Sequence, residues 1–113
     1  MERKQKVLAV FDRLNLILND INENISDLSD RMDDKLKDME NIKNNSYLSQ
    51  STKNGRLSIA LSQYNALAVQ YDDLSAKQAR ISMIVYELQD YADYGTVVPA
   101  ADRAYLALLG IDV

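Results

Sequence analysis

Five aspartates between positions 27 and 38 are the most concentrated set of chemically capable side chains in this sequence. Converging carboxylates can hold a cation, although calcium is usually bound by oxygen ligands that a loop brings together. No EF-hand spacing is present, and basic residues at i,i+4 spacing can pair with these acids along a helix. The pattern therefore favours a solvated helix surface, with a cation site or an acidic docking face as the alternative. The five are Asp27, Asp30, Asp33, Asp34 and Asp38.

The side chains that most often perform catalysis are missing. The 113 residues include no His and no Cys. This excludes a catalytic triad, a thiolate nucleophile and the usual zinc ligands. Carboxylate and lysine chemistry remain possible, but no motif brings two such groups into a pocket. We therefore expect a protein that is not an enzyme and has no catalytic residue, cofactor, metal or small-molecule substrate.

Length and charge restrict the classes of protein to which this chain can belong. A chain of 113 residues with 47% hydrophobic residues fits one folded domain. A net charge of −4 argues against nucleic acid as the main partner. No apolar stretch is long enough to span a membrane, and no signal peptide is recognisable. The expected location is therefore cytoplasmic, virion-associated or secreted without a cleaved leader.

Two series of apolar residues recur at alternating spacings of four and three, which is the heptad pattern of a coiled coil. Only Lys35 in the first series and Gln78 in the second are clearly polar. The first series is Val7, Phe11, Leu14, Leu18, Ile21, Ile25, Leu28, Met32, Lys35, Met39 and Ile42. The second is Leu57, Ala60, Tyr64, Leu67, Tyr71, Leu74, Gln78, Ile81, Val85, Leu88 and Ala92.

The two series are mirror images about the polar stretch 44–51. Each position in the first series has a counterpart in the second such that the two residue numbers add to 99, as for Phe11 with Leu88 and Leu28 with Tyr71. Each d position thereby faces an a position, as antiparallel packing requires. The sequence predicts an all-α fold: a coiled-coil hairpin over 1–94, with a helix at about 2–45, a turn at about 46–51 and a helix at about 52–94. Lys35 and Gln78 are either tolerated defects, which the pattern favours, or residues that fix the register.

The base of the hairpin, where both chain ends lie, is too apolar for two helices. The g positions beside the seam usually carry charges, but here they are Val10, Ile17, Ile84 and Tyr91. A short third helix within 95–113 can cover this surface, since Gly95 can end the second helix and Pro99 can start another. A helix this short is stable only when packed, so it covers its own base or that of a neighbouring copy.

Tyrosines and leucines near the base complete a predicted protein interface. Tyrosine is enriched at interfaces, although packing of the third helix explains the same residues equally well. At the turn, Tyr47 and Leu48 either cover the open end of the coil, which we favour, or contact a partner. The full predicted interface is Val10, Ile17, Ile84, Tyr91, Tyr94, Tyr105, Leu108 and Leu109.

In architecture the predicted hairpin resembles small helical-hairpin proteins of secretion systems, namely type VII substrates and type III needle subunits. The chain lacks the Trp-x-Gly turn of the former, because it has no Trp, and the Pro-containing turn of the latter. The stretch from Val98-Pro99 to Tyr105, with Gly110-Ile111, is similar to a segment of type III filament proteins. We expect a structural subunit that oligomerises through its base, as in a virion, filament or secretion apparatus. The alternative is a binding module, such as a chaperone, adaptor or inhibitor. The expected partners are further copies of the chain or another helical protein.

Overall fold

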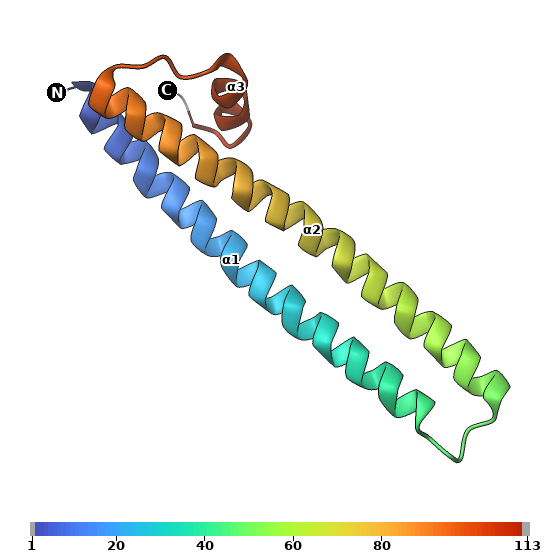
Figure 1. Ribbon diagram of the computed structural model, residues 1–113. Coiled ribbons are helices and arrows are strands. Elements are labelled where there is room, and N and C mark those ends of the chain that lie inside the picture. The colour runs from blue at the N-terminus through green and yellow to red at the C-terminus, as the bar shows by residue number, and fades with distance from the viewer. Residues whose placement is uncertain (1, 112–113) are drawn as a thin grey trace. The chain divides into compact units, whose positions relative to one another are not determined.

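A computed structural model describes residues 2–111, and their side chains from Lys4 onward. Within this range the chain forms three helices and no strand: α1 (Glu2–Lys43), α2 (Gln50–Tyr94) and α3 (Ala100–Leu108). Figure 1 shows α1 and α2 running antiparallel, with α3 beside the last turns of α2. The predicted all-α hairpin with a short third helix is confirmed. No helix in the described range has an apolar stretch that could cross a membrane.

The heptad seam forms the contact between α1 and α2. All 22 predicted seam positions are buried or half-buried, whereas most of their neighbours along each helix are exposed. The most deeply buried are Leu14, Ile81 and Leu88, each 0% exposed. Burying one such side chain stabilises the fold by about 1.5–3 kcal/mol, so the seam is the main source of the hairpin's stability.

The turn joins the two long helices with local hydrogen bonds. The Asn45 Oδ1 atom accepts a hydrogen bond from the Tyr47 backbone N–H at 2.9 Å. Ser49 caps α2, since its Oγ accepts a hydrogen bond from the backbone N–H of Thr52 at 3.2 Å. This cap explains why α2 begins at Gln50, slightly before the residue expected from the heptads. Lys53 Nζ donates to the carbonyl of Lys43 at 3.1 Å and so satisfies an acceptor at the end of α1.

Two glycines with positive φ separate and end the C-terminal elements. Gly95, at φ 71°, ends α2, and its N–H bonds the Tyr91 carbonyl at 3.0 Å. Gly110, at φ 78°, follows α3 in a Schellman motif. There the Ile111 N–H bonds the Leu106 carbonyl at 2.9 Å, while both side chains are buried. The motif thus ends α3 and at the same time turns Ile111 inward.

The contacts divide the chain into two compact units. The base unit comprises residues up to Ile21 together with those from Lys77 onward, and it includes α3. The arm unit comprises Asn22–Ala76, that is, the rest of both long helices and the turn. The units differ in burial: of the 14 buried residues, only Leu28 and Ala60 belong to the arm. The seam of the arm is therefore mostly half-exposed.

Candidate protein-interaction surfaces

In the base unit, α3 lies over the apolar surface for which the sequence predicted a third helix. The g-position residues Val10 and Ile84 are 7% and 0% exposed. Each lies one helical turn from an arginine that holds α3, Arg13 on α1 and Arg80 on α2. The chain therefore supplies the third helix that its own base requires.

A buried ion pair fixes α3 to α2. Asp102 is 3% exposed, and its Oδ1 lies 2.7 Å from Nη2 of Arg80. The guanidinium of Arg80 also lies over the ring of Tyr105, 5.7 Å from its centroid, in cation–π geometry. The Arg80 side chain keeps 38% of its surface in water, so only the carboxylate is fully desolvated. A buried carboxylate requires a partner, so α3 docks where Arg80 is available.

A second arginine fixes the end of α3 to α1. Arg13 Nη1 donates to the carbonyl oxygen of Gly110 at 3.1 Å, across 97 residues of sequence. Ile111 lies beside Val10 in a hollow that both residues line. Sequence reasoning found none of Arg13, Arg80 and Asp102. One signal was available, since Asp102 interrupts an apolar series of Val98 and Leu106 at i,i+4 spacing.

Among the described residues of the base unit, one buried side-chain oxygen has no hydrogen-bond partner. Oε2 of Glu87 is buried and accepts no hydrogen bond from the described residues. Glu87 follows Ile84 by three residues and so lies close to the α2 face that carries Arg80. A buried acceptor of this kind opposes stability, because it loses its hydration without a replacement.

The predicted interface residues fall into three groups. Val10 and Ile84 are buried within the chain, and Tyr94 and Leu108 remain 80% and 85% exposed. The half-buried group is Ile17, Tyr91, Tyr105 and Leu109. The structure therefore places part of the predicted set in the core of the base unit and leaves the rest available on its surface.

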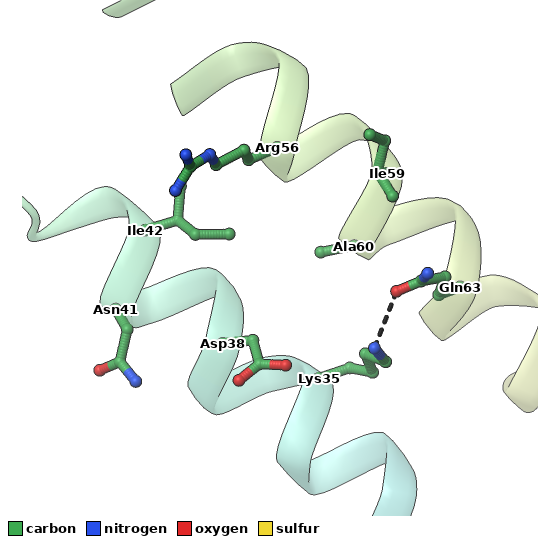
Figure 2. A pocket seen from close by; sticks show the side chains of 8 residues that line it. All are labelled: Lys35, Asp38, Asn41, Ile42, Arg56, Ile59, Ala60 and Gln63. Carbon is green, nitrogen blue, oxygen red and sulfur yellow. Dashed lines mark hydrogen bonds between the residues drawn. The ribbon is translucent and has the colours of Figure 1, made fainter. Parts of the chain in front are cut away.

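The arm unit carries an open groove between α1 and α2, shown in part in Figure 2. It consists of two adjoining hollows of about 360 and 500 Å³ that share Lys35, Asp38 and Gln63. Lys35 Nζ donates to Gln63 Oε1 at 2.8 Å across it. The other lining residues are Arg31, Asp34, Asn41, Ile42, Arg56, Ile59, Ala60, Ala66 and Leu67. The groove thus has an apolar floor and charged walls.

The acidic cluster on α1 shows no sign of a cation site. Asp27 pairs with Arg31 at 3.1 Å, and both side chains are more than half exposed. Among the described residues no group of acids could together hold a metal ion. At the turn, Tyr47 is 97% exposed and Leu48 half-buried. The expectation that both cover the end of the coil is therefore wrong for Tyr47, because its side chain points into solvent.

Comparisons with known proteins give no relative. No family model, curated protein or solved structure matches this chain.

Proposed function

We propose that this protein is a non-enzymatic binding module whose arm unit holds a helix of another protein. The supporting observation is the open groove of the arm, which is lined by the g positions Arg31, Asp38, Arg56 and Gln63. In the base unit four g positions are apolar, and two of them, Val10 and Ile84, are buried within the chain. In the arm the g positions are polar, and the described residues leave the groove open.

The groove fits an amphipathic helix of about three turns. Its lining extends from Arg31 to Ile42 on α1, which corresponds to about 16 Å at about 1.5 Å per residue. An apolar face would pack on Ile42, Ala60 and Leu67 and cover the half-exposed seam. Charged walls at the rim contribute to orientation and specificity more than to affinity.

The charges of the two walls define the partner further. Asp34 and Asp38 lie on the α1 wall, and Arg56 lies on the α2 wall. Arg31 and Lys35 also belong to α1, but Arg31 pairs with Asp27 at 3.1 Å and the Lys35 amine is hydrogen-bonded across the groove to Gln63. We expect a partner helix with basic residues on the edge facing α1 and an acidic residue facing Arg56. Such a helix would enter the groove in a single direction.

A structural subunit that assembles through its base is the second candidate. The excess of apolar g positions supported it, but α3 accounts for Val10 and Ile84 within one chain. The observation that still favours assembly is the exposure of Tyr94, Val97 and Leu108, each at least 80% exposed. Exposed apolar residues mark an interface where they form one contiguous patch.

The mass in solution and a cross-linking experiment distinguish the two candidates. A binding module should have the monomer mass of 12.8 kDa, or a small multiple of it, and a structural subunit a large defined multiple. A photo-reactive residue at Gln63, in the groove, should capture a protein partner in the cells that make this chain. The same residue at Ser62, which lies outside the groove, should not.

Groove-filling variants complete the test. Ala66→Trp should abolish the cross-link, because Ala66 lines the groove. Val69→Trp is the matched control, since Val69 is 60% exposed and does not line it. Equal capture from positions 62 and 63, or capture only of further copies of the chain, would contradict the binding module and favour the structural subunit.

A further inference from the structure

We propose that α3 is exchangeable between copies, so that the surface of the base unit beneath it docks the α3 of a second copy of this chain. Two chains would then form a reciprocal dimer, each giving its α3 to the other. The proposal goes beyond the binding module described above, because no residue of the arm groove takes part.

Every described polar contact that holds α3 joins it to the hairpin and can be reproduced between chains. These contacts are the Asp102–Arg80 pair at 2.7 Å and the Arg13 hydrogen bond to Gly110 at 3.1 Å. Leu106 and Ile111 supply the apolar part, at 0% and 4% exposure. A second copy presents the same surface, so docking in trans replaces each contact with an identical one.

Few contacts hold the connector between α2 and α3 in place. Residues 95–99 form neither helix nor strand, and four of the five are exposed. Backbone N–H groups of Thr96, Val97 and Val98 make no hydrogen bond to the backbone of the described residues. Only the Val98 side chain is buried, at 2% exposed. Because an extended residue spans about 3.3 Å, the connector can carry α3 about 16 Å from the end of α2.

α3 must dock somewhere, and its charge makes that docking selective. A helix of nine residues is not stable alone in water, so α3 is helical only when it is held against a base unit. Asp102 requires Arg80, and a segment with a basic residue at that position would place two cations together. The choice therefore lies between the chain's own base and that of another copy.

The exposed apolar residues supply a reason for the dimer. Tyr94 precedes the connector, Val97 lies within it, and Leu108 lies on the outer side of α3, at 80%, 82% and 85% exposed. Contact between the two copies at these residues would remove them from water. The dimer would therefore cover apolar area that the monomer leaves in water.

Charge reversal at the ion pair tests the exchange with full-length protein. Arg80→Asp alone places two carboxylates together, and Asp102→Arg alone places two guanidiniums together, so each variant should lose its docked α3 and stay monomeric. Mixed, the two variants can form one native pair and one reversed pair, but only by exchanging α3. We expect the mixture, and neither variant alone, to form a one-to-one dimer of twice 12.8 kDa by native mass spectrometry.

Two controls make each outcome decisive. The double variant R80D/D102R restores the pair within one chain and should behave as the wild type does. Because a buried charge change can disturb folding, isotope-labelled and unlabelled wild type are also mixed and warmed briefly, which should give dimers of mixed mass. A mixture of variants that stays monomeric, or a single variant that dimerises as well as the mixture, overturns the proposal. So does the absence of mixed-mass wild-type dimers.

Discussion

Replacing Leu106 by alanine should release α3 and leave the hairpin intact. Leu106 is fully buried, and it also anchors the Schellman motif through its carbonyl. Truncation of a buried leucine to alanine costs about 2–5 kcal/mol. The cost falls on the docking of α3, because α1 and α2 are held by their own seam. Since α3 has nine helical residues against 42 and 45 in α1 and α2, the helical signal should fall by about a tenth or less.

Hydrogen exchange is the assay that isolates this effect. The amides of Asp102 and Ile111 are hydrogen-bonded to the Pro99 and Leu106 carbonyls at 3.0 and 2.9 Å, so they report directly on α3. A loss of about 2–3 kcal/mol corresponds to exchange about 30- to 150-fold faster. The exchange rate should stop rising at the value for an unstructured chain once α3 is fully undocked, because a helix of nine residues is not stable alone.

Leu108 provides a matched control within the same helix. It is 85% exposed, so Leu108→Ala removes the same atoms without opening a cavity, and its effect should stay within about 0.5 kcal/mol. Equal effects of Leu106→Ala and Leu108→Ala on these amides would refute the docking described here. So would a large loss of α1 and α2 helicity in Leu106→Ala, because the hairpin would then depend on α3.

Four further perturbations test other features. Gly110→Ala should weaken α3 docking by about 1–2 kcal/mol, because alanine is strained at φ 78°. Gly55→Ala should instead raise the melting temperature, since Gly55 is inside α2 with no atom within 4 Å of the added Cβ. Ser49→Ala should cost about 0.5–2 kcal/mol in urea unfolding through loss of the α2 cap, whereas Ser51→Ala should have little effect. Millimolar calcium should leave the melting temperature unchanged, because the α1 aspartates do not converge and Asp27 already pairs with Arg31.

The seam was predictable because it repeats. Every a and d position requires an apolar side chain for the same reason, namely burial between the two helices. One polar residue such as Lys35 therefore does not hide the pattern. Its side chain crosses the groove to Gln63, which lets the amine stay hydrated while the stem lies in the seam. The mirror relation of the two series then predicted which residues of the two helices face each other, although the sequence contains no distances between residues.

The docking of α3 was not predictable in the same way. Arg80 and Arg13 resemble solvated helix charges in sequence, and nothing periodic connects them with Asp102 or Gly110. Their partners are determined by where a nine-residue helix settles on a surface formed by two others. The arm groove was also missed, because it arises from half-buried seam residues and polar g positions that look ordinary for a coiled coil.

The contact between Arg13 and Gly110 has a mechanical consequence. Force applied between Lys4 and Ile111 would act first on the docked α3, since Ile111 packs beside Val10 and the neighbouring Gly110 is bonded to Arg13. Once α3 is pulled away, the force separates the ends of α1 and α2. The paired seam residues of the two antiparallel helices then come apart one pair after another, starting with Val7 and Ala92. Pairs that break singly resist tension less than pairs sheared together. The contacts that hold α3 and Ile111 against α1 would therefore determine the force at which the base unit opens.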